Sequence, residues 1–489
     1  MSDVIIVGAG MGGLAAANVL AGRGLSPLVL ESESTVGGKA GCVTIDGVEI
    51  DTGPSVLTLP EVADTVFRSV GTSVQEQLRL LRPDPSFRYL FPDGSQLDVF
   101  HELVDTINSV RDVLGEEAAR EFESFLQQAK RIWESAAPSF VFAHAPTPMN
   151  VFLRGPSVWL STSRIDAFRT MQGAIVSSVS NPYLQALLLR YATYNGSDPR
   201  QAPATLNCIA HVELALGGFG IDGGMTALVR ALERSAVDKG AVIQTDTRVS
   251  RIQVERGRVL GVELEDGTTI PARSVVVNAA SSHLMNTLLP AKRTKPSVRE
   301  RSMSGWTAIV RARRQPRVAH TVAMHMPYAE EFEDIFDEGR PPVNPTVYVC
   351  AQEVCHGRAG WADEEPLFVM ANAPSTDNEQ DYSTLRETVL NTMKVRGLCT
   401  GEDAIVWERS PWDLSLQFPD TGGNIYGMAS HGWRAAFQRP SNRVAGVAGL
   451  YMASGSSHPG GGVPLAMQSG LLASDLLCED RDISTTEAS

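Results

Sequence analysis

Hydrophobic residues open the chain in a short run, Val4–Val7, which predicts a buried strand of a parallel sheet. A glycine turn follows, and the small apolar residues of Leu14–Leu20 predict a closely packed helix. A second apolar run ends at Leu30. Strand, glycine turn, helix and strand in this order predict the first unit of a parallel α/β sheet.

Alternating apolar residues return much later in the chain. Val249–Glu255 and Val259–Leu264 predict two paired strands, and Ser274–Asn278 predicts a buried strand. We interpret them as a strand meander that returns the chain to the first sheet. Near the end, Leu450–Gly455 predicts a strand and Leu465–Leu477 a helix, which repeats the opening arrangement.

A different pattern separates these segments. Helical periodicity dominates from about Pro60 to Arg190, whereas Thr346–Cys350 and Pro366–Met370 predict strands. With 489 residues the chain is too long for one ordinary core. The sequence therefore predicts two intertwined domains, α/β and α+β.

One apolar segment, residues 138–160, is broken by prolines and predicts no simple helix. It is a candidate membrane-facing segment, forming either a shallow membrane foot or the rim of an apolar tunnel. A core-packed connector fits the same pattern equally well. Liposome flotation with Phe152 and Trp159 changed to Ser would distinguish the foot from the connector.

The opening turn carries the spacing that dinucleotides require. Gly8 permits the tight turn, Gly10 lets the backbone approach a pyrophosphate, and Gly13 lets the helix pack closely on the strand. The helix N-terminus offers free N–H groups to the phosphates. Glu31 ends the second strand, where an acid can bind a ribose hydroxyl.

Three more loops are candidates for contact with the same ligand. Gly37 and Gly38 precede Lys39, which could face a phosphate, although an ordinary surface turn would have the same composition. The second loop contains Gly53, Pro54 and Ser55, and the third spans 455–464. All three combine glycine or proline with short polar residues.

Composition and charge exclude several classes of function. A formal net charge of −14 argues against nucleic-acid binding. Six cysteines without paired spacing predict reduced thiols, with neither disulfides nor a metal site. No apolar run is long enough to span a bilayer. We therefore expect a cytoplasmic protein with a candidate peripheral membrane contact.

Taken together, these blocks resemble the carotenoid (phytoene-type) desaturase branch of the FAD-dependent amine oxidase superfamily. The resemblance rests on the opening glycines with Glu31, on Val36–Lys39, on Asp51–Ser55 and, most specifically, on Gly455–Pro464. Amine oxidases usually carry an aspartate where this chain has Ser454-Gly455, which weakens the amine oxidase interpretation.

Within that branch, the chain is similar to the hydroxycarotenoid 3,4-desaturases, also called methoxyneurosporene dehydrogenases. The matching stretches include Thr346–Val349, Ala371–Pro374 and Pro419–Gly423. Related desaturases share much of this pattern.

The resemblance implies FAD as cofactor and a Rossmann-like FAD-binding domain of the glutathione-reductase and amine-oxidase type. We expect that domain to comprise residues 1–75, 205–290 and 411–480, the substrate domain 76–204 and 291–410, and a disordered tail 481–489. The expected cofactor-binding residues are Gly8, Gly10, Gly13, Glu31, Gly37, Gly38, Lys39, Gly53, Pro54, Ser55, Val249, Gly455, Gly462, Val463 and Pro464.

The implied reaction is desaturation of an apolar polyene, in which flavin accepts a hydride and oxygen or a quinone reoxidises it. His458 is the candidate catalytic residue, but a ring that only fixes its loop is the favoured interpretation. The alternatives are a flavin-dependent carotenoid isomerase, an amine oxidase and a non-catalytic lipid-binding escort protein. Flavin absorbance of the purified protein would dismiss the escort.

Overall fold

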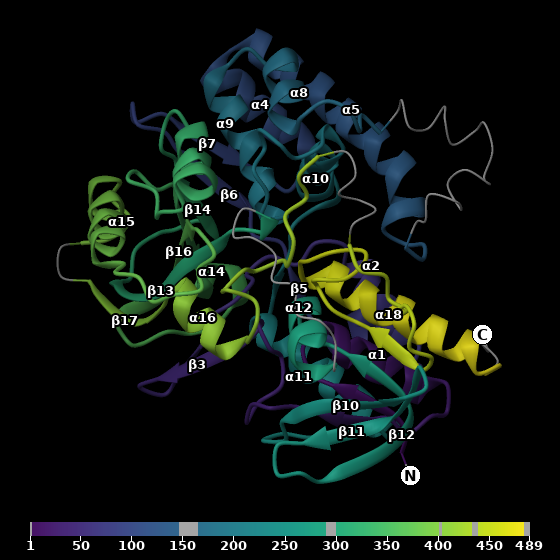
Figure 1. Cartoon of the computed structure of the whole chain (residues 1–489). Helices are drawn as coiled ribbons and strands as arrows, with labels where there is room; N and C mark the ends of the chain where they lie inside the picture. Colours follow the sequence, from purple (N-terminus) through teal and green to yellow (C-terminus); the bar gives the residue numbers. More distant parts are fainter. Residues whose placement is uncertain (1, 146–164, 290–299, 401–402, 433–438, 484–489) are drawn as a thin grey trace.

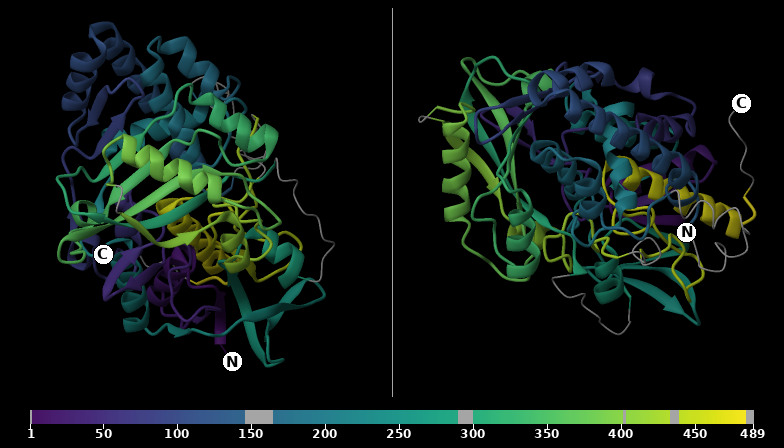
Figure 2. Two further views of the ribbon diagram at one scale, coloured as in Figure 1. Left: turned by 90° about the vertical axis from the view of Figure 1, so that its left-hand side faces the viewer. Right: turned by 90° about the horizontal axis from the view of Figure 1, so that it is seen from above.

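Two seven-stranded sheets organise the molecule (Figure 1). The computed structural model describes residues 2–145, 165–289, 300–400, 403–432 and 439–483. Helices cover both sheets, and segments from the two ends of the chain lie side by side (Figures 1 and 2). The predicted α/β class with a second α+β part is confirmed.

The first sheet has the strand order β10-β11-β12-β1-β2-β9, and β18 also pairs with β12. Strands β1, β2, β9, β12 and β18 are parallel, whereas the β10-β11-β12 meander is antiparallel, as predicted. The strands are β1 (Ser2–Val7), β2 (Leu28–Leu30), β9 (Val242–Gln244), β10 (Val249–Glu255), β11 (Arg258–Leu264), β12 (Thr269–Val277) and β18 (Leu450–Met452).

Three helices pack together on this sheet: α1 (Met11–Gly22), α11 (Met225–Asp238) and α18 (Val463–Asp480). Glycines allow the close approach that this packing needs. A Cβ at Gly13 would collide with the carbonyl oxygen of Gly8, and a Cβ at Gly470 would collide with that of Gly12. The first and last helices of the described chain are therefore in direct backbone contact.

The second sheet has the order β17-β13-β16-β15-β14-β6-β7. Its strands are β6 (Phe87–Leu90), β7 (Gln96–Val99), β13 (Ser304–Arg313), β14 (His320–Ala323), β15 (Val347–Ala351), β16 (Glu364–Ala373) and β17 (Ala404–Arg409). The helical prediction for Pro60–Arg190 missed the β6-β7 hairpin, because two four-residue strands carry too little periodicity to be recognised.

Helices α4 (Leu103–Leu114), α5 (Glu116–Phe140), α8 (Met171–Ser178) and α9 (Pro182–Leu189) gather above the second sheet (Figure 1). The prediction of no helix from Pro138 was wrong for its first residues, because α5 contains Pro138 in its last turn. Residues 146–160 of the candidate membrane-facing segment and 484–489 of the predicted tail lie outside the described residues.

The predicted domain boundaries keep the strands of the two sheets apart, and we retain that division as a proposal. Small elements connect the two parts: the hairpin β3 (Cys42–Ile45) and β4 (Val48–Asp51), strands β5 (Leu80–Leu81) and β8 (Gly220–Ile221), and helices α2 (Pro60–Arg68), α14 (Gln352–His356) and α16 (Pro411–Gln417). No described helix is long and apolar enough to cross a membrane.

Candidate functional site

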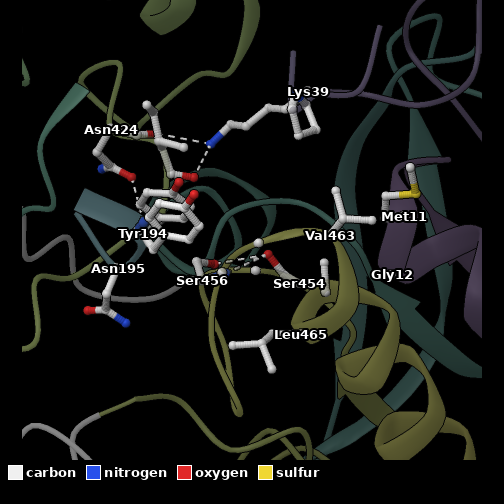
Figure 3. Close-up of a pocket in the computed structure, with 18 of the residues that line it drawn as sticks. Met11, Gly12, Lys39, Tyr194, Asn195, Asn424, Ser454, Ser456, Val463 and Leu465 are labelled. Carbon is white, nitrogen blue, oxygen red and sulfur yellow. Dashed lines mark hydrogen bonds between the residues drawn. The ribbon is translucent and has the colours of Figure 1, made fainter. Parts of the chain in front are cut away.

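A large cavity of about 1120 Å³ runs between the two sheets. It is lined by both of them and by loops from both ends of the chain (Figure 3). Every predicted cofactor residue lines this cavity except Gly13, which packs α1 on the first strand. His458 lines it as well.

Two helices begin at the cavity without a side-chain cap. Gly10 precedes α1 and Gly462 precedes α18, and no side chain in the described part of the chain caps the first N–H groups of either helix. Helix α11 is different, because Asp51 accepts a 2.6 Å hydrogen bond from the Met225 N–H. The free N–H groups and positive dipole ends of α1 and α18 fit an anionic or electron-rich ligand.

Buried positive charges in the cavity wall also favour an anionic ligand. The Lys39 amine donates hydrogen bonds to the carbonyl oxygens of Asn424 (3.0 Å) and Ile425 (2.8 Å), as Figure 3 shows. Burial and the neighbouring Arg409 lower the pKa of Lys39 to about 8. Burial also lowers the pKa of Arg409 and of Arg439 to about 10. None of these three cations is hydrogen-bonded to a carboxylate within the described residues, so the cavity wall favours an anion.

Glu31 is 7% exposed and holds the loops around the nucleotide end of the cavity. One carboxylate oxygen accepts a 2.6 Å hydrogen bond from the Ala9 N–H, and the other accepts from the Glu33 N–H (3.0 Å) and the Ser32 hydroxyl (3.2 Å). A carboxylate offers about four acceptor positions. Glu31 thus retains capacity for a ribose hydroxyl while organising the turn.

Asn278 is a site residue that the residue-level sequence analysis did not single out. It follows β12, and its Oδ1 accepts a 2.8 Å hydrogen bond from the Gly10 N–H, while its Nδ2 donates to the Ala453 carbonyl. A Cβ at Gly10 would lie 2.6 Å from the same Oδ1. Asn278 therefore locks the first glycine turn to the C-terminal strand, whereas the sequence pattern marked it only as the end of a predicted buried strand.

His458 is buried, with 3% exposure, and belongs to the cavity wall. Its Nε2–H donates a 2.8 Å hydrogen bond to the Ala143 carbonyl, just beyond the end of α5. Burial lowers the pKa of His458, so the ring is neutral at pH 7. This geometry ties the C-terminal loop to the substrate part of the chain.

Away from the glycine loops the cavity wall is mostly apolar. Trp133, Phe140, Val322, Phe368 and Met370 contribute to it from helices and strands of the second sheet's side. Sequence patterns had marked Phe368 and Met370 only as members of a strand and Phe140 only as part of the apolar segment 138–160, and they had not marked Val322.

A buried polar cluster interrupts the apolar wall. Arg190 and Tyr194 line the cavity. Behind them, Glu213 accepts hydrogen bonds from the Tyr191 hydroxyl at 3.0 Å, from Arg190 at 3.3 Å and from the Tyr194 hydroxyl. The charges of Arg190 and Glu213 thus compensate each other. We interpret the pair as a structural ion pair and not as a binding site for an anionic ligand.

Tyr328 brings a second polar position to the apolar wall. It is 2% exposed, and its hydroxyl has no hydrogen-bond partner among the described residues. Asn372 and Thr346 line the cavity with it, and both donate to the buried Glu331, at 2.6 Å from the Asn372 side chain and 2.8 Å from the Thr346 N–H. Burial raises the pKa of Glu331 to about 7.

The fold and this cavity define a dinucleotide-dependent enzyme. The family profile described as flavin containing amine oxidoreductase matches residues 11–478. The chain therefore belongs to that family, and its cofactor is FAD. The helix starts and the buried cations described above fit this group.

Similar sequences of known function indicate which branch of the family the chain belongs to. A hydroxyneurosporene desaturase of Rubrivivax gelatinosus is 34% identical over 98% of this chain and 94% of its own length. A 4,4'-diapolycopene oxygenase of a Methylomonas species is 31% identical, and a carotenoid 3,4-desaturase of Haloarcula japonica 30% identical, each over 98% of both chains. The protein falls in the carotenoid desaturase branch and is an FAD-dependent oxidoreductase.

Solved structures agree on the fold. Putrescine oxidase bound to putrescine superposes with a TM-score of 0.63 at 15% identity, covering 99% of this chain and 98% of that one. Cyclohexylamine oxidase from Brevibacterium oxydans gives 0.60 at 15% identity, covering 98% and 99%.

Proposed function

We propose that this enzyme introduces a double bond at the 3,4 position of a 1-hydroxycarotenoid during carotenoid biosynthesis. The names of the similar desaturases from Rubrivivax gelatinosus and Haloarcula japonica support this choice of substrate and bond. When bound, FAD would supply the redox chemistry: the substrate would lose a hydride from an allylic carbon to the cofactor and a proton from the neighbouring carbon, and oxygen or a quinone would take up the electrons.

The observation that carries the proposal is the Tyr328 hydroxyl, which has no hydrogen-bond partner among the described residues and lies in a mostly apolar cavity wall. A buried hydroxyl without a partner costs about 1–3 kcal/mol. A polyene with a terminal hydroxyl would satisfy it, because an alcohol both donates and accepts hydrogen bonds. An unsubstituted polyene end would leave Tyr328 unsatisfied.

The chain's own contribution is then to bind, orient and exclude water. The apolar wall takes up the polyene, and contact between Tyr328 and the hydroxyl fixes how far the chain enters. This depth would set which carbon pair lies next to the cofactor. A candidate peripheral membrane contact, through which an apolar substrate could arrive, remains part of the proposal.

The test is incubation with 1-hydroxyneurosporene and with neurosporene, measured anaerobically as flavin bleaching and, with oxygen or a quinone as acceptor, as turnover and product mass. We expect kcat/KM to favour the hydroxylated polyene by about tenfold or more, because a site built around a hydroxyl rejects analogues that lack it. The variant Tyr328→Phe should lose this preference but retain turnover of neurosporene.

Product mass separates the competing functions. A desaturase product lacks two hydrogen atoms, an isomerase product has an unchanged mass, and an oxygenase product gains oxygen. The oxygenase is the second candidate, because the Methylomonas relative with that name is 31% identical over nearly its full length. Bleaching by amines alone would contradict all three carotenoid functions.

A further inference from the structure

A cluster of sulfur and imidazole side chains lies outside the cavity lining, on the same face of the second sheet as the cavity residues Val322 and Tyr348. His320 begins β14, Cys350 lies in β15, and Cys355 and His356 end α14. Their exposed fractions are 3%, 0%, 0% and 0%. One ligand atom each from His320, Cys350 and Cys355 lies within 4.8 Å of the others, and the Cys355 sulfur is 3.4 Å from His320 Nε2.

The contacts around His320 place its Nε2 toward the sulfurs and its Nδ1 toward Tyr348, and the Nδ1–H tautomer directs the Nε2 lone pair at the Cys355 sulfur. The other ring nitrogen, Nδ1, lies 2.8 Å from the Tyr348 hydroxyl, whose oxygen can accept its N–H. Tyr348 is held in turn by the Ser55 hydroxyl at 2.9 Å. An oxygen on the distal ring nitrogen is the arrangement that orients metal-binding histidines.

His356 supplies an independent observation. The Ile221 N–H donates to its Nδ1 at 3.4 Å, so the proton of the neutral ring resides on Nε2. That buried Nε2 has no hydrogen-bond partner among the described residues, although the ring interacts with the Cys350 side chain. A neutral thiol is a weak acceptor, whereas a metal-bound thiolate is a strong one.

We propose that His320, Cys350 and Cys355 bind one thiophilic metal ion, Zn²⁺ or Cu⁺, and that the His356 N–H stabilises the Cys350 thiolate. Soft thiolate ligands with one imidazole select these ions. Binding releases the two thiol protons and involves no change of oxidation state. This inference goes beyond the proposed desaturation and opposes the sequence prediction of no metal site.

The metal would have a structural role at the junction of the two sheets. Without an ion, the Cys355 thiol donates to the Ser55 carbonyl at 3.5 Å, and this bond is lost when the thiol is deprotonated. Gln352 of the same helix and Asp51 exchange two hydrogen bonds, of 2.8 and 3.0 Å. An ion shared by Cys355, His320 and Cys350 would therefore tie α14 to β14 and β15, while Gln352 holds the helix to Asp51.

The test is elemental analysis of the full-length protein, expressed with both metals in the medium and purified without a metal-affinity tag. We expect about one ion of zinc or copper per chain, as for a closed site with protein ligands. The variants Cys355→Ser and His320→Gln should retain less than about a tenth of it. Cys399→Ser serves as the matched control, because Cys399 is also buried but lies elsewhere, and it should retain the full amount.

A second measurement uses the unmodified protein, in case a variant fails to fold. Titration with an organomercurial should release the metal to a coloured chelator in step with the modification of two thiols. His356→Gln should weaken metal retention by about 10–100-fold, as loss of an outer-shell partner does. Absence of metal, a Cys350–Cys355 disulfide in the intact mass, or full metal content in Cys355→Ser would overturn the proposal.

Discussion

The two parts of the cavity are built in different ways. The part that we propose receives the nucleotide is made mainly of backbone, with the uncapped starts of α1 and α18 and the glycine turns between them. The part toward the second sheet is made of side chains from separate strands and helices. Backbone donors recognise features common to every FAD, whereas side chains determine which substrate fits.

The strongest test of this difference is to place a side chain in the part of the cavity that is built from backbone, because it should reduce FAD binding. In Gly10→Val the new Cβ would meet Asn278 Oδ1 at 2.6 Å. Overpacking of about 1–3 kcal/mol should lower bound FAD by about tenfold, read as flavin absorbance per protein after gel filtration. Gly24→Asn is the control, because Gly24 has φ +78° in an open turn and Asn tolerates that conformation. Normal FAD content in Gly10→Val would contradict the comparison.

The capped helix α11 sharpens the contrast with α1 and α18. Asp51 accepts from the Met225 N–H and the Thr226 hydroxyl, and it pairs with buried Arg358 at 3.0 Å. Asp51→Ala should therefore lower the free energy of unfolding by about 3–5 kcal/mol, measured by urea denaturation. The exposed carboxylate Glu116, changed to Ala, should cost less than about 1 kcal/mol. A small effect at Asp51 would mean that the cap is dispensable.

The part of the cavity built from side chains should make the free energy of unfolding depend on pH. Burial raises the pKa of Glu331 to about 7 in the folded protein, whereas an unfolded glutamate titrates near 4.3. Between these two pKa values the folded state binds more protons at Glu331 than the unfolded state does. The contribution of Glu331 to the free energy of unfolding is therefore greatest below pH 4.3 and decreases as pH rises to 7. The loss from this group should be on the order of 3 kcal/mol.

Urea denaturation across that pH range checks the expectation. Glu331→Gln should remove this slope, and the exposed neighbour Glu330→Gln is the control. An unchanged slope in Glu331→Gln would show that another group is responsible.

The smallest effect is expected at His458, where the two parts meet. His458→Ala loses the hydrogen bond to the Ala143 carbonyl and should cost about 1 kcal/mol. Turnover with bound FAD should stay within about threefold of normal, because general acid–base catalysis would contribute about 10²–10⁴-fold. A loss in that larger range would make His458 a proton acceptor instead of a loop anchor.

Sequence patterns could predict the backbone-built part because its requirements are local. A tight turn needs glycine, a pyrophosphate needs free N–H groups, and both follow directly after a strand. The structure accordingly lines the cavity with all predicted cofactor residues except Gly13. The role of Asn278 was missed because its partners, Gly10 and Ala453, are far away in the chain.

The substrate part could not be predicted in the same way. Tyr328, Thr346 and Asn372 come together only through the pairing of β14, β15 and β16, which sequence periodicity does not specify. The same pairing brings His320 next to Cys350. Neither the orphan hydroxyl nor the sulfur cluster has a local spacing that distinguishes it from an ordinary strand.

The contact between α1 and α18 has a consequence for synthesis. The nucleotide compartment needs β18 beside β12 and α18 against α1, so it is incomplete until Asp480 has left the ribosome. Before α18 is in place, the apolar surface of α1 that packs against it is exposed. The complete compartment therefore requires segments that are more than 400 residues apart in the sequence to be folded together.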